Sequence, residues 1–120
     1  MHILKASHRL LLAGLLLSAP VMAEEQRLTG PEIQAALSDR TLQGTLEDGK
    51  QWQQIFQKSG VTFYSVGSAQ SQGRWEVRGD QYCSQWPPNE SWTCYDMRVD
   101  ADDYSFISAS GQRSTGKLLN

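Results

Sequence analysis

Most of this chain alternates polar and apolar residues with the period of two that is typical of a half-buried β-strand. The clearest case is the segment 74–78, where Trp75 and Val77 share one face and charged residues take the other. Turn-forming residues separate such segments, and the stretch from Gly67 to Gly73 is expected to be a polar loop. The predicted strands are 41–46, 51–57, 61–66, 74–78, a strand around Cys83, its hairpin partner ending at Val99, 104–109 and 112–118.

One segment near the N-terminus follows the helical period instead. Ile33, Ala36 and Leu37 recur on one helical face. Thr29 and Glu32 have the spacing of a capping box, in which each side chain accepts a hydrogen bond from the other residue's backbone N–H. The sequence therefore predicts one short helix that Thr29 caps and that is over by residues 40–44.

Together these elements predict a mainly β fold. We expect a small antiparallel barrel or a curved meander sheet of about eight short strands, with one short N-terminal helix. A closed or curved sheet also protects the strand edges of a small exported domain. Large aromatic side chains need burial in so small a domain, and the four predicted to fill its core are Trp52, Phe56, Phe63 and Trp75.

The first 23 of the 120 residues do not belong to this pattern. Lys5 and Arg9 precede and flank an apolar run over 10–19, and small residues end the segment at Ala23. These features are typical of a secretory signal peptide. We therefore expect residues 1–23 to be removed and residues 24–120 to form a single domain that is periplasmic or secreted. The apolar run is about half a bilayer span, so no stable membrane insertion is expected.

Removal of the signal also removes both histidines, His2 and His8. The domain then has no imidazole for a Ser-His-Asp triad, a Cys-His pair or a His-based metal site. Nine Lys and Arg residues stand against 13 Asp and Glu residues, a net charge of −4 that disfavours nucleic acid as a partner. We expect no metal and no cofactor. The remaining acid–base chemistry is a carboxylate pair, and its candidates, otherwise expected in turns and on solvated strand faces, are Glu76, Asp80, Asp96, Asp100, Asp102 and Asp103.

Cys83 and Cys94 are the two cysteines of an exported chain, which favours a disulfide. The turn-forming group 87–90 falls midway between them, so a hairpin bent there places the two sulfurs opposite each other. Alternation along this hairpin puts Tyr82 and Trp86 on one face with Tyr95, and Trp92 on the other face beside the disulfide. Trp92 either contributes to a contact surface, or shields the disulfide, or is covered together with the disulfide by the helix. The residues predicted to bind a ligand or partner are Tyr82, Trp86, Trp92 and Tyr95.

Residues 73–88 read G-x-W-x-V-x-G-D-x-x-C-S-x-W-P-P, followed by Cys94-Tyr95 and preceded by the opening L-T-G-x-E-I at 28–33. This pattern resembles a family of small secreted proteobacterial proteins of unknown function. The resemblance implies an exported β-rich domain with one disulfide and carries no activity with it.

These observations favour a non-catalytic exported envelope protein that binds a small apolar ligand or a partner protein. The alternative is a proteinaceous inhibitor or accessory subunit that docks through the disulfide hairpin. A carboxylate-dependent glycan hydrolase, using Glu76 or Asp80, is a third hypothesis.

Overall fold

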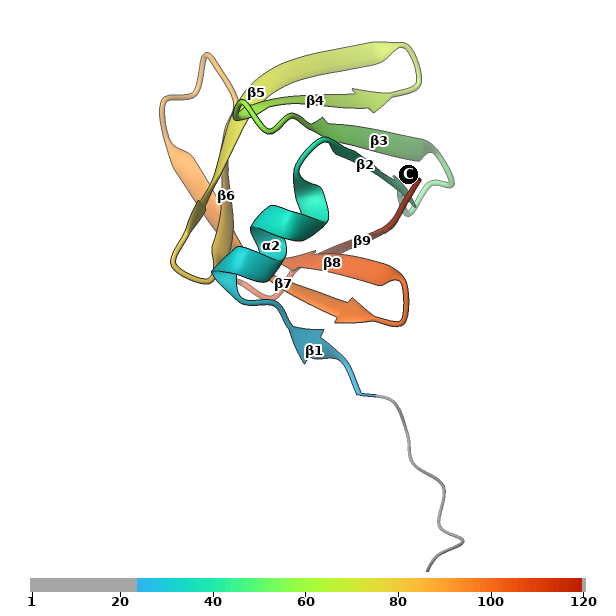
Figure 1. Cartoon of the computed structure of the whole chain (residues 1–120). Coiled ribbons are helices and arrows are strands. Elements are labelled where there is room, and N and C mark those ends of the chain that lie inside the picture. Colours follow the sequence, from blue (N-terminus) through green and yellow to red (C-terminus); the bar gives the residue numbers. More distant parts are fainter. Residues whose placement is uncertain (1–23, 120) are drawn as a thin grey trace, which may run out of the picture.

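The computed structural model describes residues 24–119, so the predicted signal peptide over 1–23, with both histidines, lies outside the described residues. Figure 1 shows a ring of strands with one helix. The elements are β1 (Gln26–Arg27), α2 (Gly30–Leu37), β2 (Arg40–Thr45), β3 (Gln51–Phe56), β4 (Val61–Val66), β5 (Ala69–Arg78), β6 (Gln81–Gln85), β7 (Trp92–Asp100), β8 (Asp103–Ile107) and β9 (Arg113–Leu118).

Strands β2 to β9 form a closed antiparallel barrel in which each strand pairs with the next along the chain. Closure comes from the first and last strands of this series, because Leu42 of β2 pairs with Leu118 of β9. Of the two architectures predicted from the sequence, the barrel is confirmed. The short strand β1 was not predicted, and it pairs with Arg98 and Val99 of β7, beyond the point where β6 stops pairing.

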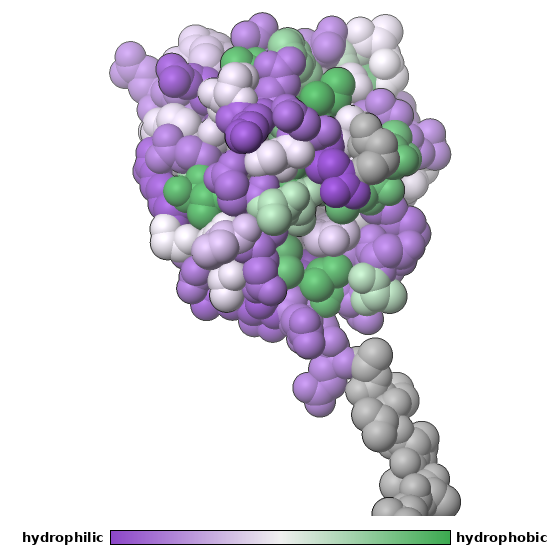
Figure 2. Space-filling view, in the orientation of Figure 1, coloured by the Kyte–Doolittle hydropathy of each residue, from purple (hydrophilic) through white to green (hydrophobic). Residues whose placement is uncertain are grey.

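The helix α2 lies at one end of the barrel, within the ring of strands in Figure 1. The predicted capping box is confirmed, since the Glu32 amide donates to Thr29 Oγ1 at 3.4 Å and the Thr29 amide donates to Glu32 Oε1 at 2.8 Å. Ile33 and Leu37 are fully buried against the barrel interior. The helix therefore closes this end, whose outer face is mostly hydrophilic (Figure 2).

Phe56 lies at the centre of the barrel core. Its ring makes edge contacts with Trp75 and Tyr82, at centroid distances of 5.8 Å and 5.7 Å. The predicted core positions Trp52, Phe56 and Trp75 are confirmed by their burial. Phe63 is an error of the prediction, because it pairs with the exposed Ile55 on the outside of the barrel and is only half-buried.

The polar loop expected between Gly67 and Gly73 is also an error. β5 begins at Ala69 and is ten residues long, so only Gly67 and Ser68 make the turn from β4. Residues 69–72 are exposed, and this half of the strand is held by its backbone pairing with β4. A strand that buries neither face produces no alternation, which is why the sequence pattern missed it.

The disulfide hairpin is confirmed. Cys83 and Cys94 are bonded and directly opposite each other in the ladder between β6 and β7, in which Gln85 pairs with Trp92 nearer the turn. Cys83 is fully buried, with Glu76 of β5 and Cys94 of β7 beside it in the sheet. Cys94 is half-buried.

Candidate functional site

The end of the barrel opposite α2 holds a cavity of about 550 Å³. Its rim is made by residues next to the four turns at this end, those that follow β2, β4, β6 and β8. Six aromatic side chains line it, five of them on strands β3, β4, β6, β7 and β8 and the sixth directly after the end of β6. They are Trp52, Tyr64, Tyr82, Trp86, Tyr95 and Phe106.

The cavity wall is uncharged. Among the described residues that line it there is no Asp, Glu, Lys or Arg, and its polar members are serines, glutamines and tyrosines. The deepest part is buried and the rim is exposed, so the wall changes from aromatic at the floor to neutral polar at the mouth. The buried floor comprises Trp52, Gln54, Tyr82, Ser84 and Phe106, and the exposed rim comprises Leu46, Gln70, Ser71, Gln72 and Ser114.

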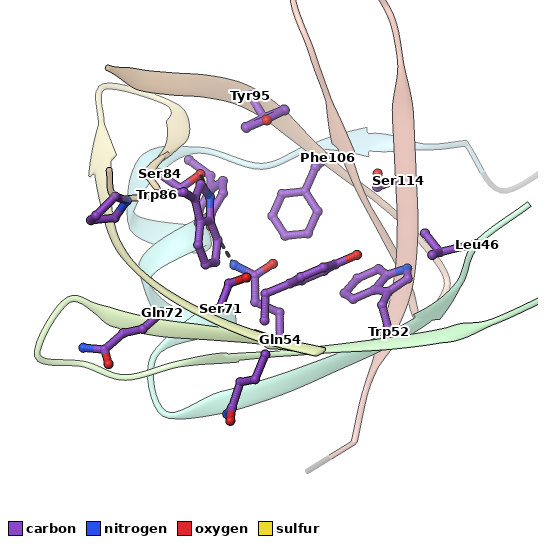
Figure 3. Close-up of a pocket in the computed structure, with 14 residues that line it drawn as sticks. Leu46, Trp52, Gln54, Ser71, Gln72, Ser84, Trp86, Tyr95, Phe106 and Ser114 are labelled. Carbon is purple, nitrogen blue, oxygen red and sulfur yellow. Dashed lines mark hydrogen bonds between the residues drawn. The ribbon is translucent and has the colours of Figure 1, made fainter. Parts of the chain in front are cut away.

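Two indole rings lie on opposite sides of this cavity, with the Gln54 amide between them (Figure 3). Each ring lies against a glycine. A Cβ added at Gly73 would come within 2.6 Å of Trp86, and one added at Gly44 would come within 2.6 Å of Trp52. The absence of side chains at these glycines therefore leaves the space that the two indoles occupy.

A hydrogen-bonded network fixes the polar part of the floor. Gln54 Nε2 donates to Thr62 Oγ1 and to the Tyr82 hydroxyl, both at 3.0 Å. Thr62 Oγ1 in turn donates to the Ile55 carbonyl at 2.8 Å. On β6, the strand that carries Tyr82, Ser84 Oγ accepts a hydrogen bond at 3.2 Å from Nε1 of Trp86, which directly follows the strand. These contacts connect the side chains that the two indoles flank.

Burial raises the pKa of Tyr82 to about 12, although hydrogen bonds with Ser84 and Gln54 act in the opposite direction. Burial also raises the pKa of Tyr64, which lines the same cavity. Both phenols are therefore neutral at physiological pH, and they offer hydrogen bonds and ring surface to a ligand rather than a base.

The structure brings together three of the four predicted binding residues. Tyr82, Trp86 and Tyr95 line the cavity, while Trp92 lies on the opposite face of the hairpin. There the Arg78 guanidinium sits over the Trp92 ring, 4.7 Å from its centroid. The sequence reasoning did not select the other lining residues, because their inward positions looked the same as ordinary core positions. The missed residues include Gln54, Tyr64 and Phe106, and also Trp52, which had been assigned to the core.

The candidate carboxylates do not converge on this cavity. Glu76 pairs with Arg78 on the outer surface, and Asp80 accepts a hydrogen bond from the Gly30 amide at 2.7 Å. The described part of the chain contains no group of three or more His, Cys, Asp and Glu side chains placed to hold a metal ion. Three other candidates pair with cations away from the cavity: Asp96 with Arg27, and Asp102 and Asp103 with Lys117.

Comparison with known proteins gives no relative. The chain matches no protein-family model, and no curated protein or solved structure is significantly similar to it. The resemblance to a family of small secreted proteins therefore stays a prediction. Within residues 24–119, no helix has the length and apolar character needed to span a membrane.

Proposed function

We propose that this protein is a non-catalytic exported binding protein that holds a small, uncharged, largely apolar ligand in the open end of its barrel. The observation that carries this proposal is the uncharged cavity of about 550 Å³ with six aromatic side chains in its wall. Ligand sites are typically cavities of roughly 300–1,000 Å³, lined by hydrophobic and aromatic side chains with a few placed polar groups. The cavity has the size and composition of such a site.

The titratable groups around the cavity support binding rather than catalysis. Among the described residues, those that line the cavity and can ionise are tyrosines, and the pKa of Tyr82 is raised to about 12. General acid–base catalysis needs groups whose pKa lies near the working pH. The hypothesis of a glycan hydrolase depends on Glu76 or Asp80, and both lie outside this cavity.

The disulfide supports an oxidising compartment, which agrees with the predicted signal peptide over 1–23. We therefore place the ligand in the periplasm or outside the cell. No cofactor is part of this proposal.

The alternative is docking of the disulfide hairpin on a partner protein, as an inhibitor or accessory subunit. The turn residues 87–91 are exposed, as such docking requires. However, Trp86, the largest apolar side chain at this bend, turns into the cavity and does not face outward. Because aromatic anchors carry much of the energy of protein interfaces, this orientation favours a small ligand.

The test is a fluorescence titration of the mature protein with N-phenyl-1-naphthylamine, a neutral apolar dye that brightens in an apolar site. We expect saturable binding, and a loss of affinity of about tenfold or more in Trp86→Ala, because that change removes a large part of the aromatic wall. Trp92→Ala is the matched control. It removes a half-buried indole from the outer face of the same hairpin.

The control variant should bind the dye within about twofold of the unmodified protein, because aromatic contacts act only where they touch the ligand. Far-ultraviolet circular dichroism establishes that both variants are folded. Absence of dye binding, or an equal loss of dye affinity in the two variants, would overturn the proposal and favour the docking hypothesis.

A further inference from the structure

We infer that the ligand carries a hydrogen-bond donor, an N–H or O–H group, which it gives to the side-chain carbonyl oxygen of Gln54. This inference rests on the proposed function and names the ligand class more closely, as an uncharged, largely apolar molecule with one inward-facing donor. Gln54 lies in the cavity wall, yet its side chain is only 8% exposed.

The orientation of the Gln54 amide follows from its neighbours. Thr62 has one hydroxyl proton, and it donates that proton to the Ile55 carbonyl at 2.8 Å. Thr62 Oγ1 can then only accept from Gln54, so the amide nitrogen and not the oxygen must face it, at 3.0 Å. The second hydrogen of this nitrogen goes to the Tyr82 hydroxyl. Both donors of the amide are therefore used by the protein itself.

The amide oxygen is left for a ligand. None of the described residues donates a hydrogen bond to Gln54 Oε1, whereas every fully enclosed side-chain nitrogen or oxygen in the described part of the chain has a partner. The oxygen must therefore open onto the cavity. Figure 3 shows the Gln54 amide reaching into the space between Trp86 and Trp52.

This geometry discriminates between ligands. In the empty cavity water can donate to the Gln54 oxygen, and a ligand that displaces this water without replacing its hydrogen bond leaves a buried acceptor unpaired. A ligand with a donor recovers the bond. The two nitrogen donors of Gln54 are already committed, so an acceptor group on the ligand gains nothing at this position.

The experiment compares indole with benzofuran, which has the same bicyclic shape and carries an oxygen in place of the N–H. Both compete with N-phenyl-1-naphthylamine for the mature protein, and displacement of the dye gives each affinity. We expect indole to bind about tenfold more tightly than benzofuran, the effect of one hydrogen bond to a buried acceptor. In Gln54→Met the two affinities should agree within about twofold, since the acceptor is gone.

Gln53→Met is the matched control, because it makes the same substitution at the neighbouring glutamine of β3, which is exposed on the outer face and lies outside the cavity. It should keep the preference for indole. A further competitor, 1-methylindole, has no N–H and should bind like benzofuran to the unmodified protein. This comparison needs no variant, so it decides the question even if Gln54→Met does not fold.

The outcomes separate the two proposals. If the dye binds but indole, 1-methylindole and benzofuran bind equally, the role of Gln54 is overturned and the binding function stands. If Gln54→Met folds and keeps the preference for indole, the donor is recognised elsewhere and the inference is also overturned. If neither the dye nor indole binds, the proposed function itself fails.

Discussion

The indole of Trp86 lies directly over the backbone of Gly73. A Cβ built at Gly73 would stand 2.6 Å from Trp86 Cε3 and 2.6 Å from the Gln85 carbonyl oxygen, both far inside van der Waals contact. Gly73 pairs with the inward-facing Thr62 of β4 and is buried, so this close approach occurs on the cavity side of β5. The position of one wall of the cavity therefore depends on a glycine in the neighbouring strand.

Gly73→Ala should displace Trp86 and impair the cavity. Because the new methyl group meets both a ring and a backbone carbonyl, we expect a loss of about 1–3 kcal/mol in the free energy of unfolding. Affinity for N-phenyl-1-naphthylamine should fall about tenfold or more, since aromatic wall contacts are lost. Urea denaturation and dye titration measure the two effects. Arg74→Ala, at the next and outward-facing position, should change neither. Unaltered dye affinity in Gly73→Ala would show that Trp86 keeps its position in the cavity wall despite the added methyl group.

The uncharged wall should exclude anions. Because the described residues that line the cavity include no cation, a carboxylate inside it would be desolvated without a partner. We expect 1-naphthoate to displace the dye at concentrations about tenfold or more above those needed for 1-naphthol at pH 7. Equal competition by the two compounds would contradict this prediction. It would mean that 1-naphthoate binds with its carboxylate at the polar rim, outside the aromatic floor.

Tyr82 should make the protein sensitive to alkali. Burial raises the pKa of Tyr82 in the folded protein from its ordinary value near 10 to about 12. Between these values the unfolded chain releases a proton that the folded protein keeps. The contribution of the neutral Tyr82 phenol to the free energy of unfolding is therefore complete below about pH 10. It is lost as the pH rises toward 12, at about 1.4 kcal/mol per pH unit.

Urea denaturation at several pH values from 9 to 11.5 measures this slope. Tyr82→Phe has no phenol at this position and should show a clearly shallower decline over the same range. A decline of the same steepness in both proteins would assign the alkaline loss to other groups.

Asp80 should prove structural. Its carboxylate accepts the Gly30 amide at 2.7 Å, and this bond connects the turn between β5 and β6 to the first residue of α2. Asp80→Ala removes a charged acceptor from a helix N-terminus and should cost about 1–2 kcal/mol of unfolding free energy. Dye affinity should stay within about twofold, because α2 closes the opposite end of the barrel. A large loss of dye affinity without a loss of stability would contradict this assignment.

Local features of the fold were predictable from the sequence. The capping box of Thr29 and Glu32 specified the start of α2, and the turn at 87–90 together with two cysteines specified the register of the disulfide hairpin. The prediction of strands and core residues was wrong where the residue types along a segment do not reflect its burial. The half of β5 before Gly73 is exposed on both faces, and Phe63 is an aromatic residue on the outer surface.

The candidate site was only partly predictable. Alternation along the hairpin correctly put Tyr82, Trp86 and Tyr95 on one face, and it put Trp92 on the other, where it cannot share their cavity. Gln54 was not selected, because the sequence pattern of a strand does not show which residues a glutamine side chain will contact. Its partners are Thr62, eight residues later in the chain, and Tyr82, three strands away.

The sequence by itself determined most of the strands, the short helix, the disulfide and the exclusion of histidine chemistry from residues 24–120. Periodicity, capping, turn chemistry and composition act over a few neighbouring residues, and they failed only for β1 and the first half of β5. Only the tertiary structure decided that β2 pairs with β9 and closes the ring. It also decided which inward-facing side chains fill the core against α2 and which surround the cavity. Those properties depend on the convergence of strands far apart in the chain, and a strand's own pattern of burial is the same whether it faces packed side chains or an open cavity.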